Sequence, residues 1–207
     1  MKQAREKLVI GLTGPMCAGK NLAASILEKK GYLVADADLI AHQALLDVRD
    51  SVVAAFASTA HSRGIILLNE DGTIHRRALG SLIFSDPALL ALHESIIYPR
   101  INQLLNFFID THSGKGVVIN AALLHKSPIL ERCTFVIFID SWVVFRFFRA
   151  LRRDKLPFNQ IIDRFSAQKH LFAQYLSKNV DIQRVYNRGS IRALERKLEK
   201  LLSHREY

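Results

Sequence analysis

Short apolar runs alternate with amphipathic stretches along most of the chain. Four of these runs, at residues 7–13, 32–35, 117–120 and 135–139, are rich in branched and aromatic side chains and contain little charge. Runs of this length and composition are typical of strands that are buried on both faces of a parallel sheet. Because such strands alternate here with helical patterns, the sequence predicts the α/β class, in which a parallel sheet is wrapped by helices.

Helical periodicity fills the intervals between these strands. From Lys20 to Gly31 the apolar side chains recur at the spacing of one helix face, namely Leu22, Ala23, Ile26 and Leu27. A helical pattern with little strand character runs through residues 62–112, and another, interrupted near Pro157, runs through residues 145–176. A last amphipathic helix is predicted by Ile191, Leu194, Leu198, Leu201 and Leu202.

Composition limits the class of protein. The 207 residues carry 29 Lys and Arg against 19 Asp and Glu, a net charge of +10, and 49% of them are apolar. This apolar share supports one packed domain and excludes a disordered chain. No run approaches 18 apolar residues, so we expect no membrane span. Two cysteines cannot build a disulfide framework, which favours a reducing compartment, and we expect a cytoplasmic protein.

The clearest chemical signal is the sequence GPMCAGKN at residues 14–21, between the first predicted strand and the first predicted helix. Its frame, G-x-x-x-x-G-K, is that of a phosphate-binding loop. The glycines let backbone N–H groups face the phosphates, the helix N-terminus adds partial positive charge, and Lys20 reaches the terminal phosphates. The alternative is a loop that no longer binds phosphate.

The residue after that lysine departs from the usual frame. The loop normally ends in Ser or Thr, whose hydroxyl binds Mg²⁺, and this chain has Asn21 there. An amide oxygen can also bind Mg²⁺, although its reach and direction differ. We therefore expect phosphate binding, with Asn21 as the candidate metal ligand.

Two carboxylates follow the second predicted strand, at Asp36 and Asp38. In open α/β sheets the ligand crevice lies beyond the carboxyl ends of the strands, so carboxylates at this point face the site. A kinase that acts on a hydroxyl needs a carboxylate to orient that hydroxyl and accept its proton. Capping of the next helix by Asp38 is the alternative, and it would explain one of the two residues.

Positive charge is concentrated between residues 146 and 155. Arg146, Arg149 and Arg153 fall on one face of a predicted helix, and apolar residues occupy the other face: Val144, Phe148 and Leu151. Guanidinium groups carried by a mobile lid stabilise a transferring phosphoryl group. A solvated arginine face is the alternative interpretation. Net charge alone would also attract RNA, but nothing else in the sequence supports a nucleic-acid partner.

In order and spacing, these segments resemble the dephospho-coenzyme A kinase family nearly end to end. The resemblance includes the phosphate loop, VADADLIAH at residues 34–42, and DGTIHRRAL at residues 71–79 followed by IF at residues 83–84. It continues with Arg149 and Arg153 as lid arginines, Arg164 and Gln168 as an R-x-x-x-Q signature, and NRG at residues 187–189.

The resemblance implies a P-loop kinase fold within a single domain, residues 1–207. Its core would comprise residues 1–61, 113–145 and 177–207, with a helical CoA-binding insertion at residues 62–112 and a lid at residues 146–176. It also implies ATP-dependent phosphorylation of the ribose 3′-hydroxyl of dephospho-CoA, the final step of coenzyme A biosynthesis. The implied partners are ATP, Mg²⁺ and dephospho-CoA. From charge and hydropathy we expect neither a nucleic-acid partner nor a membrane.

The same resemblance assigns roles to individual residues. The ATP phosphates would be held by Gly14, Gly19 and Lys20, with Cys17, Ala18, Asn21 and Leu22 completing the loop. Asp38 would orient and deprotonate the acceptor hydroxyl, and Arg149 and Arg153 would steady the transferred phosphate. Asn187 and Gly189 would lie near the adenine, and Arg76 would contact the acceptor.

Several positions depart from the family pattern. Pro15 and Cys17 replace two loop glycines, and non-glycine residues resist positive φ, which restricts the turn. Tyr98 replaces a histidine before Pro99, and Lys126 replaces a glutamate. The alternative function is therefore a catalytically weakened or inactive family member that binds nucleotide or CoA, and a divalent-metal titration would distinguish the two.

Overall fold

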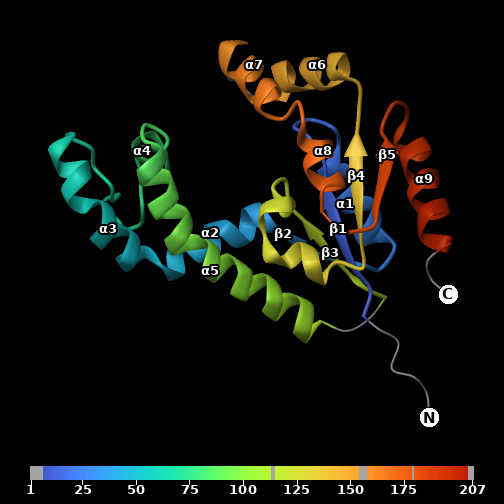
Figure 1. Ribbon diagram of the computed structural model, residues 1–207, viewed down its shortest axis with the longest axis horizontal. Coiled ribbons are helices and arrows are strands. Elements are labelled where there is room, and N and C mark those ends of the chain that lie inside the picture. Colours follow the sequence, from blue (N-terminus) through green and yellow to red (C-terminus); the bar gives the residue numbers. More distant parts are fainter. Residues whose placement is uncertain (1–6, 113–114, 154–157, 179, 205–207) are drawn as a thin grey trace. The chain divides into compact units, whose positions relative to one another are not determined.

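The computed structural model describes residues 7–112, 115–153, 158–178 and 180–204, with the side chain of Arg153 outside the description. The chain forms two compact units (Figure 1). The first unit comprises Met1–Asp36 and Phe108–Tyr207, and the second comprises Ala37–Phe107. Each unit is described by itself below.

A parallel sheet is the centre of the first unit. Its strand order is β2-β3-β1-β4-β5, and the strands are β1 (Val9–Thr13), β2 (Leu33–Asp36), β3 (Val117–Asn120), β4 (Phe135–Asp140) and β5 (Ile182–Tyr186). The predicted α/β class and the four predicted strands are confirmed. The edge strand β5 was not predicted, because only two of its side chains are aliphatic and most of it is partly exposed.

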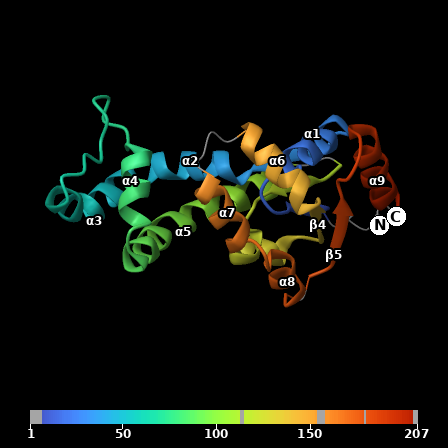
Figure 2. The same ribbon diagram turned by 90° about the horizontal axis from the view of Figure 1, so that it is seen from above.

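The two faces of this sheet are covered by different helices. Alternate residues of β4 point to one face, where α1 (Lys20–Lys29) and α9 (Ile191–Ser203) pack on them side by side (Figures 1 and 2). On the opposite face, the ring of Phe138 contacts Phe172 and Tyr175 of α8 (Leu171–Leu176). The short helices η1 (Leu124–Lys126) and η2 (Pro128–Arg132) follow β3. The predicted helix beginning at Lys20 and the C-terminal amphipathic helix are confirmed.

Helices α6 (Val143–Arg153) and α7 (Phe158–Ala167) follow β4. The predicted two-faced character of α6 is confirmed, but its orientation is the reverse of a solvated arginine face. Arg146 is buried at 7% exposure, whereas Val144 and Phe148 are exposed at 61% and 59%. The predicted break at Pro157 lies outside the described residues.

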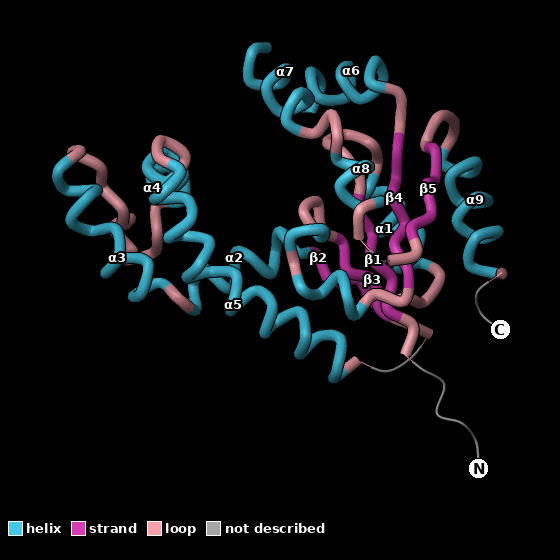
Figure 3. The backbone as a smooth tube through the Cα atoms, in the orientation of Figure 1, coloured by secondary structure: helices cyan, strands magenta, loops and turns pink. Residues whose placement is uncertain are grey.

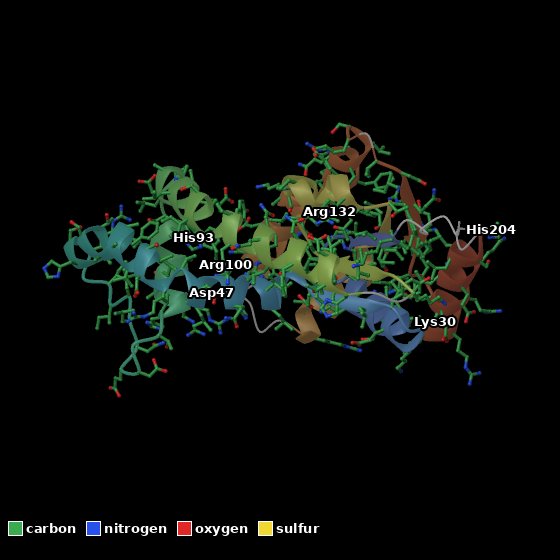
Figure 4. The ribbon with its side chains drawn as sticks, turned by 90° about the horizontal axis from the view of Figure 1, so that it is seen from below. Lys30, Asp47, His93, Arg100, Arg132 and His204 are labelled. Carbon is green, nitrogen blue, oxygen red and sulfur yellow. The ribbon has the colours of Figure 1, made fainter. Side chains whose placement is uncertain are left out.

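The second unit is helical (Figure 3). It contains α2 (Ala37–Asp47), α3 (Arg49–Ser62), α4 (Arg76–Ile83) and most of α5 (Pro87–Thr111). Its core is built from residues of all four helices, including Ala44, Phe56, Leu82 and Ile97. Because α2 and α3 share this core, the compact unit begins at Ala37, well before the start of the predicted insertion at residue 62. An ion pair between Arg100 Nη2 and Asp47 Oδ2, 2.7 Å apart, also joins α5 to α2 (Figure 4).

Among the described residues, no helix combines the length and the apolar character that crossing a membrane requires.

Candidate active site

The phosphate loop joins β1 to α1 and needs glycine at both ends of its frame. Gly14 has φ +152°, and a Cβ atom there would collide with the backbone carbonyl of Ile139. Gly19 has φ +102°, and a Cβ atom there would collide with the side-chain amide of Asn187. Both positions therefore strongly favour glycine: the backbone conformation strains any side chain there, the Ile139 backbone leaves no space at Gly14, and Asn187 would have to move at Gly19.

Cys17 is the one non-glycine residue with positive φ in the described part of the chain, at +59°. Cys17 is the third residue of a four-residue turn that is closed by a hydrogen bond from the Ala18 N–H to the Pro15 carbonyl, 3.1 Å long. Pro15, the other replaced glycine, has no such conformation. The expected restriction of the loop thus falls on Cys17, where a left-handed conformation costs about 1–3 kcal/mol.

Two arginines of α6 bind the outer edge of the loop. Arg146 Nε donates to the Met16 carbonyl at 2.9 Å, and Arg149 Nη1 donates to the Cys17 carbonyl at 3.1 Å. Arg146 also lies over the ring of Phe165 in α7, with Cζ 4.7 Å from the ring centroid. Burial lowers the pKa of Arg146, and the charges of Asp140 and Cys17 act in the opposite direction. The arginine face of α6 therefore points toward the phosphate loop.

Asn187, directly after β5, binds the loop backbone through its side-chain amide. It is buried, and its Nδ2 donates to the Ala18 carbonyl at 2.9 Å. Its own backbone N–H donates to the Asp140 carbonyl at 2.7 Å, and its carbonyl accepts from Ser141 Oγ at 2.9 Å. In this structure Asn187 is thus a support of the loop backbone, and its adenine contact stays a prediction.

Lys20, Asn21 and Asp36 meet at Asn120, the last residue of β3. Lys20 Nζ donates to Asn120 Oδ1 at 2.6 Å, and Asn120 Nδ2 lies 3.2 Å from Asp36 Oδ2 and 3.4 Å from Asn21 Oδ1. Asn120 is buried at 2% exposure. The sequence reasoning missed this residue. Its signal was a polar side chain that ends an otherwise apolar strand, VVIN, beside the strand that carries the loop.

Two side-chain oxygens beside Lys20 are of the type that binds Mg²⁺. Asn21 offers an amide oxygen and Asp36 a carboxylate, and both lie within 3.4 Å of the same Asn120 amide nitrogen. Mg²⁺ in phosphate-transfer sites takes one or two protein oxygens together with phosphates and water. Apart from this pair, the described residues contain no group of three or more His, Cys, Asp or Glu that could hold a metal ion.

None of the contacts given above involves the remaining predicted residues. Asp38 is exposed in the first turn of α2, and Arg76 is exposed at the first residue of α4, both in the second unit. Leu22 is a half-buried residue of α1, and Gly189 is exposed just before α9. The side chain of Arg153 lies outside the description. The roles of these residues stay predictions.

The comparison with protein families decides the assignment, because the model for dephospho-CoA kinase matches residues 8–184. The chain belongs to the dephospho-CoA kinase family. It is 36% identical over 200 residues to a dephospho-CoA kinase of Treponema pallidum, covering 95% of both chains. It is 37% identical over 197 residues to that of Treponema denticola, covering 93% of this chain and 88% of the relative.

A solved structure supports the fold assignment. The dephospho-CoA kinase of Campylobacter jejuni superposes with a TM-score of 0.70 over 94% of this chain and 95% of that one, at 19% identity. The predicted family and the predicted P-loop kinase fold are therefore confirmed. Kinases of this fold use ATP, generally together with Mg²⁺.

Proposed function

We propose that this protein transfers the γ-phosphoryl group of ATP to the ribose 3′-hydroxyl of dephospho-CoA, giving coenzyme A and ADP. The observation that carries the proposal is the family match over residues 8–184, within which the G-x-x-x-x-G-K frame forms an intact strand–loop–helix. The relatives are named as dephospho-CoA kinases along almost their whole length.

Catalysis would consist of positioning and charge stabilisation. The loop N–H groups and Lys20 hold the β- and γ-phosphates, and Asn120 fixes the direction of the Lys20 ammonium. Arg149 already lies at the loop, where its Nη1 donates to the Cys17 carbonyl, and a guanidinium group carries five N–H donors in all. These groups oppose the negative charge of the phosphoryl group in transit.

The acceptor side rests on Asp38. Its carboxylate would accept the proton of the 3′-hydroxyl as that oxygen bonds to the γ-phosphorus, and the bond from phosphorus to the β–γ bridging oxygen breaks to release ADP. Arg76 and Arg153 are proposed to contact the acceptor and the transferred phosphate, and Asn187 and Gly189 the adenine.

Asn21 and Asp36 would hold the Mg²⁺ that accompanies ATP. When bound, this ion neutralises phosphate charge and orients the phosphate oxygens. The chain's own part is to keep the two oxygen donors in place through the Asn120 amide.

A test of acceptor chemistry uses dephospho-CoA and its 3′-deoxy analogue, with ATP and Mg²⁺. We expect coenzyme A, identified by mass and by the 3′ position of its phosphate, and no phosphorylated product from the analogue. Asp38→Asn should lower kcat about 10²-fold or more while the KM for ATP changes less than about threefold. Phosphorylation of the 3′-deoxy analogue would refute the proposed acceptor.

A second candidate function is favoured by the two amides, Asn21 and Asn120, that lie beside Lys20. With neutral amides near the metal position, the chain could bind ATP and CoA while turning over slowly. Asn21→Ser supplies the compact hydroxyl that the loop usually carries. Coenzyme A formation by Asn21→Ser, but not by the unaltered chain, would establish this weakened form.

The expectation of a cytoplasmic protein that acts on small molecules, without nucleic acid, stays a prediction.

A further inference from the structure

We propose that Arg146 and Gln168 are positioning residues for nucleotide binding, because together they hold Cys17 in a left-handed conformation that glycine would adopt unaided. The inference rests on the ATP binding of the proposed function. It adds two residues to the binding apparatus: Arg146 comes from α6, and Gln168 directly follows α7.

The Met16 peptide unit is held at both of its polar groups. Its N–H donates to Gln168 Oε1 at 2.7 Å, and its carbonyl accepts from Arg146 Nε at 2.9 Å. These two side chains come from positions more than a hundred residues away in sequence, so the contacts depend on how α6 and α7 lie on the loop. Met16 immediately precedes Cys17, and its two hydrogen bonds therefore fix the backbone direction from which Cys17 continues.

The carbonyls of three consecutive loop residues are all occupied by side chains. Besides Arg146 on Met16, Arg149 donates to Cys17 and Asn187 donates to Ala18. A carbonyl that is bound on the outer side of the loop cannot turn toward the phosphates. The arrangement thus keeps these three carbonyls from facing the anion. The N–H groups of Met16 and Ala18 donate within the protein, to Gln168 Oε1 and the Pro15 carbonyl, so we assign the anion to N–H groups of the other loop residues.

These contacts matter because residue 17 is a cysteine and not a glycine. A non-glycine residue at φ +59° persists only when its surroundings determine its conformation. Glycine reaches the same φ without steric cost. If Arg146 and Gln168 compensate for the side chain at position 17, then removing them should matter much less when position 17 is glycine.

Calorimetric titration with ATP and Mg²⁺, without an acceptor, tests this dependence. Gln168→Ala should raise the Kd for ATP about tenfold in the unaltered background and less than about threefold in the Cys17→Gly background. Arg146→Met should follow the same pattern. The matched controls are Gln174→Ala, at an exposed position of α8, and Arg152→Met, at an exposed position of α6. They should change the Kd less than twofold.

Equal losses in both backgrounds would overturn the inference, because a purely structural role of Gln168 would not depend on residue 17. The inference would also be overturned if Arg152→Met weakened ATP binding as much as Arg146→Met, since net charge would then explain the effect.

The titration distinguishes this inference from the proposed function, because ATP binding is measured without transfer. A chain that binds ATP with the expected pattern but makes no coenzyme A refutes the proposed reaction alone. If the unaltered chain binds no ATP, the Tm of thermal unfolding tests the inference instead. Cys17→Gly should raise the Tm by about 2–4 °C in the unaltered chain, where it removes strain, and less in Gln168→Ala, where the loop is released. Equal Tm shifts from Cys17→Gly in the unaltered chain and in Gln168→Ala would overturn the inference.

Discussion

Asn120 connects residues that are proposed to bind phosphate and Mg²⁺. Its Oδ1 accepts from Lys20, and its Nδ2 faces both Asp36 and Asn21. One buried amide thus orients an ammonium group and two candidate metal-binding oxygens. An amide in this position supplies both an acceptor and a donor, and a carboxylate would supply acceptors only. The amide also places a neutral group, rather than a negative charge, beside the proposed metal position.

Asn120→Ala should raise the Kd for ATP about tenfold, because the Lys20 ammonium loses its buried acceptor. The control is Lys20→Ala, in which the same Asn120→Ala change should add less than about threefold. Titration of all three variants and the unaltered chain with ATP measures the coupling. Fully additive losses would show that Asn120 does not act through Lys20.

At the residue scale the sequence predicts the loop but not its supports. The glycines, Lys20 and Asn21 are recognisable because their spacing is local. Asn120, Arg146 and Gln168 reach the loop from distant segments, and nothing in a single polar residue shows which loop it will contact. Asn120 becomes part of the site because β3 pairs with β1 and β2, and strand order is a property of the whole sheet.

At the element scale, α6 illustrates how periodicity can identify two faces without telling which one is buried. Its arginine face is held by loop carbonyls, and its apolar face is exposed. The usual rule, with apolar residues inward, fails because the phosphate loop offers carbonyl acceptors that only donors can satisfy. Strand β5 was missed for a related reason, since an edge strand with mixed polarity lacks an apolar run.

Two substitutions in α6 test this orientation. Phe148→Gln, on the exposed face, should change the free energy of unfolding by less than about 0.5 kcal/mol. Ala150→Leu should lower it by about 1–3 kcal/mol, because Ala150 is fully buried and the larger side chain overpacks its site. Denaturant titration of both variants measures the difference. A larger cost for Phe148→Gln than for Ala150→Leu would contradict the orientation.

At the scale of the whole molecule, the sequence predicts the α/β class and the family but not the limits of the helical unit. Its core joins residues of α2 and α3 to those of α4 and α5, and these contacts span much of its sequence. Periodicity describes each helix separately, so it could not show that α2 and α3 pack with the later helices.

Stability should depend on pH through His93 of α5 (Figure 4). Its ring packs beside that of Phe56 of α3. Burial lowers its pKa below 6.5, and attraction by Glu94 only partly opposes this effect. As pH falls below about 6.5, the unfolded chain takes up this proton before the folded one, so folding stability decreases toward acid pH.

His93→Gln should therefore reduce the fall in Tm between pH 7 and pH 5. His61→Gln, at an exposed position of the same unit, is the matched control and should keep the fall seen in the unaltered chain. An unchanged fall in His93→Gln would contradict the account of His93.

We propose that this loop, with Cys17 and Asn21 in place of its usual residues, still supports phosphate transfer to dephospho-CoA. The most direct measurement is the initial rate of coenzyme A formation at saturating ATP, Mg²⁺ and dephospho-CoA, beside the Lys20→Ala variant. We predict coenzyme A from the unaltered chain and a rate at least about 10²-fold lower in Lys20→Ala. No coenzyme A from the unaltered chain, or equal rates in the two proteins, would refute phosphate transfer by this loop.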